Sequence, residues 1–335
     1  MRKFLRRLGV ALALLVLVGG IAAWQGWRLY TQPGPLAEDR AVVIPRGGAQ
    51  ATARVLHEAG VIAEPRAFAL AARITRGTGP LRAAEFAFPA HASIAEVLRI
   101  LREARPVQRR LTIPEGLTAR QIATLLEDAE GLTGELPPIA EGSVLPETYA
   151  YRWGDTRASI LRRAEQAMTQ ALAEAWAQRD EGLPLASARA ALILASIVER
   201  ETGLQEERPR IAAVFINRLR RGMPLQSDPT VIYAAAEGGA LDRPLTRVDL
   251  ERDHPFNTYR NRGLPPAPIA APGREALRAV TQPAKTDDLY FVADGSGGHA
   301  FARTLEEHNR NVARWRQIER ARAGAGGPEP PATAR

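Results

Sequence analysis

Two carboxylates follow a long apolar run in the middle of the chain. The run occupies residues 190–198, and Glu199 and Glu201 come directly after it. Its length and its alanine and leucine content predict a helix, with Ser187 as the N-cap and Gly203 beyond the end. A carboxyl group that is buried beside apolar neighbours has a raised pKa, which suits a general acid. We therefore expect acid–base chemistry at the end of this helix.

The helical repeat places the two acids on different sides. At about 100° per residue, Glu199 shares a column with the small residues Ala195 and Ser196, which leave room for a ligand. The bulky residues that share the column of Glu201 are Leu194, Ile197 and Val198. We therefore predict that Glu199 is the catalytic acid and that Glu201 faces the core as a structural partner. The alternative is that both acids only close the helix, with Arg200 complementing its dipole.

The composition is that of a folded protein with one large or two ordinary domains. Of its 335 residues, 45% are hydrophobic and 24% are charged. The net charge of +8 does not indicate nucleic-acid binding, because four basic residues lie in the first seven positions and no basic stripe with interleaved aromatic residues follows. The absence of cysteine excludes disulfides and thiolate catalysis. No zinc-ligand spacing or phosphate-binding glycine loop predicts a metal or a cofactor.

The N-terminal segment has the pattern of a membrane anchor. Residues 8–24 carry no charge, and Trp27 and Tyr30 follow them. A bilayer core needs about 20 apolar residues at 1.5 Å each, with aromatic residues favoured at the interface. We therefore predict a transmembrane helix over residues 8–30 that crosses the inner membrane once, with a cytoplasmic N-terminus and an extracytoplasmic remainder. The alternative is a cleaved signal peptide, since residues 21–23 include two alanines.

The next segments predict a linker and a small α/β subdomain. Residues 31–40 contain a short, stiff Pro- and Gly-containing spacer. Residues 41–135 repeat a short strand ended by proline, a turn and an amphipathic helix. A further helix at residues 65–76 gives residues 42–88 a β-α-α-β order, which resembles a LysM-like module, a fold that holds N-acetylated glycan chains. The alternative is a scaffold without a glycan site, because a fold alone does not confer a function.

The remaining chain predicts a mixed α+β catalytic domain over residues 136–318. Helices are expected at residues 158–179 and 188–201 and from residue 209, and polar, Pro-rich loops follow them. Such loops on a helical scaffold commonly build clefts for polar ligands. The tail, residues 319–335, is rich in Gly, Pro, Ala and Arg and is predicted to be disordered. The fold class is thus α+β with an N-terminal transmembrane helix.

An ordered set of motifs resembles those of a known family. The motifs are LPETY (145–149), LASIVERET (194–202), VFINRL (214–219), LQSDPTVIY (225–233), NTY (257–259), GLPP (263–266), YFV (290–292), GH (298–299) and HN (308–309). Together they resemble the endolytic murein transglycosylases of the MltG or YceG-like type. The sequence departs from the family pattern at Glu147, Ala267 and Ala271, where Asp, Gly and Asn are usual.

The resemblance implies a reaction on peptidoglycan. It implies cleavage of the β-1,4 bond between N-acetylmuramic acid and N-acetylglucosamine within a nascent glycan strand, which leaves a 1,6-anhydro end and would limit strand length. The family's helix glutamate carries over to Glu199, which would act first as the acid and then as the base toward the C6 hydroxyl. A hydrolase would need a second carboxylate, from Asp228 or Glu147. The groups predicted to bind substrate are Gln226, Asp228, Thr230, Asn257, Tyr259, Glu147 and Tyr149.

Two other functions stay open at this stage. The chain could be a non-catalytic glycan-binding scaffold protein of the cell-wall synthesis machinery, with the LysM-like half as its binding site. A lyase acting on a small cytoplasmic metabolite is the other alternative, and it conflicts with the predicted anchor. The resemblance implies glycan strands and peptidoglycan synthases as partners, and no cofactor.

Overall fold

The computed structural model describes residues 2–324, which form two compact units. Of the described residues, the first unit comprises residues 2–109 with Ala150–Asp155, and the second comprises Arg110–Tyr149 with residues 156–324. The segment after Arg110 packs within the second unit, because Gly116 N–H donates to Ala271 O and the Thr118 hydroxyl donates to Gly238 O.

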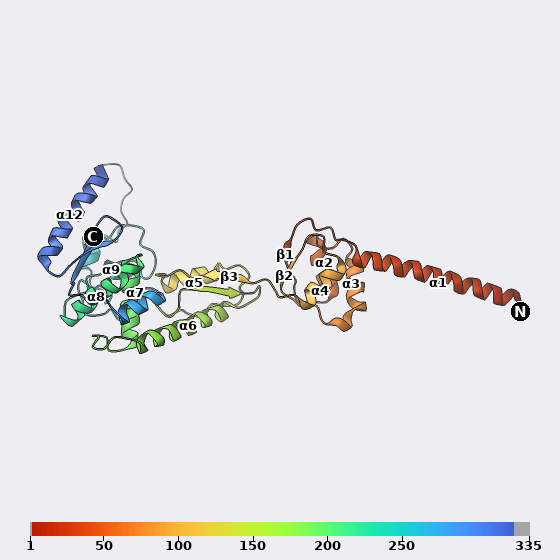
Figure 1. Ribbon diagram of the computed structural model, residues 1–335, viewed down its shortest axis with the longest axis horizontal. Helices are drawn as coiled ribbons and strands as arrows, with labels where there is room; N and C mark the ends of the chain where they lie inside the picture. The colour runs from red at the N-terminus through yellow and green to blue at the C-terminus, as the bar shows by residue number, and fades with distance from the viewer. Residues whose placement is uncertain (1, 325–335) are drawn as a thin grey trace. The chain divides into compact units, whose positions relative to one another are not determined.

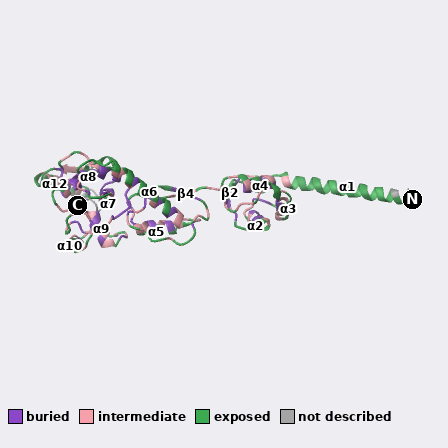
Figure 2. Cartoon of the chain, turned by 90° about the horizontal axis from the view of Figure 1, so that it is seen from below, coloured by how far each residue is buried: buried purple, intermediate pink, exposed green. Residues whose placement is uncertain are grey.

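The N-terminal helix α1 (Arg2–Thr31) fits a single-pass membrane anchor. Its segment Arg6–Thr31 is long and apolar enough to cross a membrane, with a mean hydropathy of 2.1 in its most apolar window. No part of that window is buried within the protein, as the exposed colour of the helix in Figure 2 shows. An apolar helix without protein cover is suited to a lipid environment.

The rest of the first unit is a β-α-α-β module followed by a helix, in the order that the sequence predicts (Figure 1). The elements are β1 (Arg40–Val43), α2 (Ala49–Glu58), α3 (Pro65–Ile74), the 3-10 helix η1 (Arg76–Thr78), β2 (Glu85–Phe88) and α4 (Ile94–Glu103). Strands β1 and β2 pair in antiparallel fashion, with Val42 opposite Phe86. Leu56, Phe68 and Leu98 complete a core that is almost fully shielded from solvent.

The second unit contains helices around an apolar core and one β-hairpin. Its elements are α5 (Ala119–Glu127), α6 (Arg157–Ala177), α7 (Ala188–Glu201), η2 (Gln205–Glu207), α8 (Arg208–Arg220), α9 (Asp228–Ala236), α10 (Arg247–Glu251), α11 (Arg274–Thr281), β5 (Tyr290–Ala293), β6 (His299–Ala302) and α12 (Leu305–Gly324). Two further strands, β3 (Arg109–Thr112) and β4 (Thr148–Tyr151), include the residues at which the chain passes from one unit to the other. Strand β3 pairs with β4 and not with β1 or β2. The third strand–helix repeat is therefore not a further copy within the N-terminal module.

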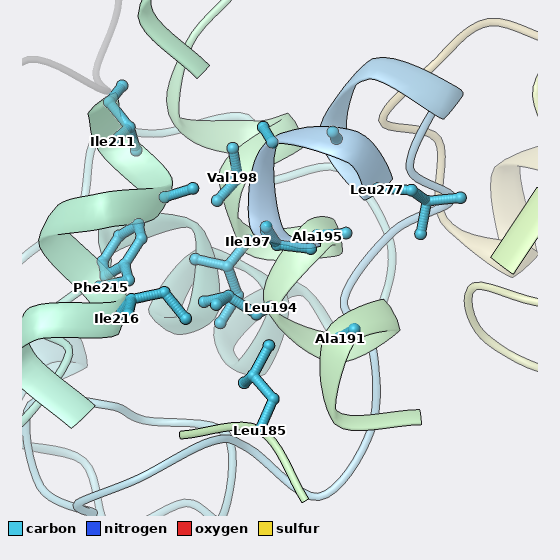
Figure 3. Packing of buried hydrophobic residues seen from close by; sticks show 14 of the residues in the cluster. Leu185, Ala191, Leu194, Ala195, Ile197, Val198, Ile211, Phe215, Ile216 and Leu277 are labelled. Atoms are coloured by element: carbon cyan, nitrogen blue, oxygen red, sulfur yellow. The ribbon is translucent and has the colours of Figure 1, made fainter. Parts of the chain in front are cut away.

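Helix α7 runs through the centre of this core. The Ser187 hydroxyl accepts from Ala190 N–H, which confirms the predicted N-cap. Leu194, Ile197 and Val198 are fully buried and lie toward α8, in the cluster that Figure 3 shows. The bulky column of the helix therefore faces the core, as its spacing predicts.

Helix α12 corrects the predicted disorder of the tail. It continues to Gly324, so residues 319–324 are helical, and residues 325–335 lie outside the described part of the chain. Ala, Arg and Glu favour helix, and an ion pair between Glu306 and Arg310 joins successive turns. The helix packs on the β5–β6 hairpin, where Trp315 is buried. Packing on the hairpin thus stabilises a helix in a segment whose composition alone suggested disorder.

Candidate active site

A cavity of 560 Å³ lies at the end of α7. Its walls come from α7, α8, the loop before α9, the loop around Tyr259, strands β5 and β6, and helix α12. The polar and aromatic residues that line it are Glu201, Arg218, Gln226, Asp228, Tyr259, Phe291, His299, His308, Trp315, Arg316 and Glu319. A cavity with aromatic walls and convergent polar groups is the usual form of a small-ligand site.

Glu201 is the carboxyl group that α7 delivers to this cavity. It is the last residue of the helix and only 9% exposed. The Ser227 hydroxyl donates to its Oε1 over 2.5 Å. Burial raises the pKa of Glu201 to about 7, and the nearby charge of Asp228 adds to the rise, whereas the Ser227 hydrogen bond and Arg218 oppose it. A carboxyl group with this pKa is half protonated near neutral pH and can act as a general acid.

Glu201 is buried, as a residue that faces the core would be, and it also lines the cavity, which the helical repeat does not predict. Leu194, Ile197 and Val198 of the same column do face the core, but α7 ends beyond them. At Glu201 the neighbouring segment is the loop with Ser227 and Asp228, and the cavity lies beside it. Residues on one face of a helix contact different elements along its length. The last turn of α7 can therefore face a cavity although earlier residues of the same face contact the core.

Glu199, the predicted acid, forms an ion pair on the other side of α7. Its Oε1 accepts from Arg208 over 2.7 Å, and its Oε2 accepts from Gly273 N–H over 2.8 Å. Arg208 also donates to Glu115 over 3.0 Å. The Glu199 side chain is 3% exposed and is not among the residues that line the cavity. Burial raises the pKa of Glu199 to about 7, while the Gly273 hydrogen bond and the Arg208 charge oppose the rise. Glu201 has the same pKa, so the pKa does not distinguish the two carboxylates.

The room expected beside Glu199 is occupied by the chain itself. Ala195 and Ser196 are fully buried. The Ser196 hydroxyl accepts from Ile269 N–H over 3.0 Å and donates to Ile193 O. Small residues on a helix allow either a ligand or another chain segment to approach, and here the segment around Ile269 does so. Glu201 therefore lines the cavity and Glu199 does not, although the two residues are about equally buried, with exposed fractions of 9% and 8%.

Three of the predicted substrate-binding residues lie in the cavity with Glu201. They are Gln226, Asp228 and Tyr259. The Tyr259 hydroxyl donates to Asp228 Oδ1 over 2.6 Å, and burial raises the pKa of both groups. Gln226 is exposed and has a left-handed backbone with φ +50°, a conformation that costs energy for a residue other than glycine. Its amide is thus held at the cavity by a strained backbone.

Thr230 and Asn257 support the cavity from behind and do not line it. Both are fully buried. The Asn257 amide donates to two backbone carbonyls, and its Oδ1 accepts from Tyr259 N–H over 3.0 Å. Thr230 donates to Ser227 O over 2.7 Å. They therefore position Tyr259 and Ser227.

Glu147 and Tyr149 have other partners. Glu147 is an exposed side chain that accepts from Arg274 over 2.9 Å. The Tyr149 hydroxyl is buried and donates to Leu145 O over 2.7 Å. Neither residue is among those that line the cavity. Of the two candidates for a second carboxylate, the structure brings only Asp228 into the cavity.

Sequence reasoning assigned no role to Arg218 or His299, although both belong to the quoted motifs. The Arg218 guanidinium is buried and donates to Leu225 O and to Leu289 O, which fixes its charge at the cavity wall. The His299 Nδ1 lies 2.7 Å from Glu207, a contact that places the ring proton on Nδ1. Leu289 holds Arg218 at the cavity, and Glu207 holds His299 there. These partners are distant in the chain, so no local sequence pattern reveals them.

Two ring nitrogens in the cavity wall have no partner. His308 Nδ1 and Trp315 Nε1 are buried and form no hydrogen bond with any residue that the structure describes. The His308 ring stacks on Tyr290 at a centroid distance of 5.1 Å. Burial lowers the pKa of His308, so the neutral ring is favoured. Buried polar atoms are normally satisfied, so these two are available to a ligand. The sequence motif HN includes His308, whereas nothing in the sequence identified Trp315.

Comparisons with known proteins show the family of the chain. A sequence model of the YceG-like family matches residues 42–314, which include both units and every residue of the cavity up to Val312. The chain belongs to the YceG-like family. The predicted family is thereby confirmed.

Two curated relatives of this YceG-like chain are named endolytic murein transglycosylase. One, from Bacillus subtilis (strain 168), is 42% identical over 170 residues, which are 51% of this chain and 46% of the relative. The other, from Streptococcus pneumoniae serotype 2 (strain D39 / NCTC 7466), is 30% identical over 321 residues, 81% of this chain and 57% of the relative. The chain therefore spans about half the length of the curated relatives that it matches.

A solved structure of a yceG-like protein from Listeria monocytogenes is similar in fold. It is 28% identical in sequence, covers 82% of this chain and 98% of its own, and superposes with a TM-score of 0.53. The mixed α+β architecture is thus shared with a solved member of the YceG-like family.

Proposed function

We propose that the chain is a lytic transglycosylase of peptidoglycan in which Glu201 is the catalytic acid. The observation that carries the proposal is the cavity at the end of α7, where Glu201, and not Glu199, meets Gln226, Asp228 and Tyr259. The names of the relatives from Bacillus subtilis and Streptococcus pneumoniae support the substrate class. The substrate is the bond between N-acetylmuramic acid and N-acetylglucosamine within a nascent glycan strand.

The proposed reaction needs one carboxyl group in two protonation states. Protonated Glu201 donates its proton to the glycosidic oxygen while the bond from C1 to that oxygen breaks, through an oxocarbenium-like transition state. The resulting carboxylate removes the proton from the C6 hydroxyl, whose oxygen bonds to C1. The 1,6-anhydro ring forms without consuming water, and Glu201 regains its proton. The Tyr259 hydroxyl and the Gln226 amide bind the polar groups of the sugars.

Hydrolysis is a second candidate, because Asp228 lies in the same cavity. Its carboxylate could activate water, as the second acid of a hydrolase does. The hydrogen bond from Tyr259 already engages Asp228 Oδ1, and burial raises its pKa, which favours a positioning role. The two reactions differ in product, since the anhydro end is lighter by one water than the hydrolytic reducing end.

The test compares the two carboxylates of α7. The full-length protein in detergent is incubated with uncrosslinked glycan strands, and the products are identified by mass spectrometry. We expect anhydro-ended fragments from the wild type and a loss of about 10²–10⁴-fold in rate for Glu201→Gln, the usual contribution of a general acid. Glu199→Gln should retain cleavage per folded molecule.

Three outcomes would contradict the proposal. Strands that bind but stay intact with the wild type would favour the non-catalytic scaffold. Loss of cleavage in a folded Glu199→Gln variant, with Glu201→Gln active, would restore Glu199 as the acid. Reducing ends that disappear in Asp228→Asn would identify a hydrolase. Circular dichroism of each variant shows whether it is folded.

The other parts of the chain support a position at the cell wall. We propose that α1 crosses the inner membrane once, because basic residues Arg6 and Arg7 precede its apolar segment and favour a cytoplasmic N-terminus. The β-α-α-β order of the first unit supports a LysM-like glycan-holding role. Peptidoglycan synthases are the proposed partners, since they would supply nascent strands at the same membrane. Protease protection in spheroplasts tests the topology.

A further inference from the structure

A second cavity, in the first unit, lies between α1 and α3. Its volume is 850 Å³, and its lining is predominantly apolar. Ala22, Ala23 and Gly26 of α1 and Ala67 and Ala71 of α3 are among the residues that line it. Small side chains on both facing helices leave a groove where larger ones would bring the helices into contact. The small residues of α1 and α3 therefore account for the groove.

The large apolar residues of this groove are turned to solvent. Trp27 is 66% exposed, Leu70 59% and Ile74 73%. Among the described residues outside α1, the exposed large hydrophobics are Leu70, Ile74, Val248 and Leu305, so two of the four lie in this groove. Leu70 and Ile74 are four residues apart and share one face of α3. A contiguous exposed apolar surface of this kind marks a binding site.

The position of the groove along α1 indicates what covers it. From Leu8, about 20 residues at 1.5 Å each span the roughly 30 Å bilayer core and end at Trp27. The groove begins at Ala22 and includes Trp27 and Tyr30, so it lies where the outer leaflet meets water. Its apolar surface is continuous with the lipid-facing surface of α1, and this placement rests on the proposed membrane anchor.

We propose that this groove holds an acyl chain of an anionic phospholipid from the outer leaflet, with the lipid phosphate at Arg66. Arg66 lines the groove, is exposed, and stands one turn before Leu70 on the same face of α3. Arg28 lies in the last turn of α1, beside the groove-lining residue Trp27. Glu64 is the one acidic residue of the lining. A guanidinium group binds a phosphate through charge-assisted hydrogen bonds, and acyl methylenes fit the small-residue walls. The lipid thereby fixes the first unit on the membrane surface.

The test uses the full-length protein in nanodiscs of phosphatidylcholine that contain a phosphatidylglycerol with a photoreactive acyl chain. We expect labelled peptides from α1 and from α3. Leu70→Ser with Ile74→Ser should reduce the α3 label about tenfold, because it removes more than 1.4 kcal/mol of apolar burial. The matched control, Val248→Ser with Leu305→Ser, should leave the label unchanged. Arg66→Gln should reduce labelling by phosphatidylglycerol more than labelling by a photoreactive phosphatidylcholine, because both lipids carry the phosphate but only phosphatidylglycerol has a net negative charge.

The outcomes separate this inference from the proposed function. Label on α1 without label on α3, or an α3 label that survives Leu70→Ser with Ile74→Ser, would overturn the lipid site and leave the anchor intact. No label on either helix would contradict the anchor as well. A photoreactive residue at position 74 that captures a protein in cells would show that a partner's helix occupies the groove. Cleavage of soluble strands should be the same in the serine variants and the wild type.

Discussion

The Ser227 hydroxyl donates a hydrogen bond to Glu201 Oε1 over 2.5 Å, although the two residues are 26 positions apart. Ser227 directly precedes α9, and Thr230 holds its backbone carbonyl. This contact fixes the carboxyl group at the cavity wall and stabilises its charged form. Burial works in the opposite direction, and it is the larger effect, since the pKa of Glu201 rises to about 7.

The cleavage rate should fall as the pH rises through about 7, because the proposed reaction requires protonated Glu201. Ser227→Ala removes a hydrogen bond that lowers this pKa, so the fall should move to higher pH. The rate of strand cleavage between pH 5 and 9 measures the shift. Ser159→Ala, which removes an exposed hydroxyl of α6, is the control and should keep the wild-type profile. An unchanged profile in Ser227→Ala would contradict the role of this contact.

Glu201→Gln should be more stable than the wild type at alkaline pH. The folded pKa of about 7 lies above the ordinary value of 4.5, so the folded state binds the proton more tightly. The free energy of unfolding is then highest below pH 4.5 and falls as the pH rises through 7. The fall is about 3 kcal/mol, because each unit of the pKa difference contributes about 1.36 kcal/mol. Urea unfolding at pH 4 and pH 8 tests this. The gain should appear only at pH 8, and exposed Glu251→Gln should show none.

Glu199→Gln should destabilise the protein more than Glu115→Gln, because it leaves the buried Arg208 without its nearest partner. Glu115→Gln is the matched variant, since Glu115 binds the same guanidinium but its side chain is 39% exposed. Its loss should stay below about 1 kcal/mol. Urea unfolding at pH 7 measures both. Equal losses would mean that Glu199 is not the principal partner of Arg208.

Trp315→Phe should raise the KM for glycan strands by about five- to tenfold, which corresponds to one lost hydrogen bond. The variant removes the unpaired Nε1–H and keeps an aromatic ring in the wall. Trp176→Phe, in a partly buried position of α6, controls for loss of an indole. Steady-state kinetics and thermal unfolding measure the two effects. A stable Trp315→Phe variant with unchanged KM would show that the Nε1–H does not bind substrate.

Gln226→Gly should stabilise the fold and reduce activity. Its left-handed backbone costs about 1 kcal/mol that glycine does not incur. Glu237→Gly is the control: Glu237 also has φ +50°, at the end of α9, and should gain stability without loss of activity. Gln226→Asn, which tolerates this conformation and keeps an amide, should retain part of the activity. Thermal unfolding and cleavage rates separate the two effects, and full activity of Gln226→Gly would exclude a role for the amide.

The sequence by itself determined the elements and the family. The apolar segment of residues 8–30, the β-α-α-β order and helix Ala188–Glu201 with its Ser187 cap follow from local composition and spacing, which act within a few residues. The ordered motifs identified the YceG-like family. Three members of the cavity, Gln226, Asp228 and Tyr259, were also found in this way.

The tertiary structure alone decided which carboxylate of α7 meets the cavity. The helical repeat correctly separated Glu199 from Glu201, but it could not show what covers each side. The segment with Ile269 and Gly273 covers Glu199, while the loop at Ser227 and helix α12 form the cavity that Glu201 lines. Both carboxylates are buried. These partners lie far away in sequence, and a side chain's pKa and access depend on them. A carboxylate's role is therefore set by what packs against it.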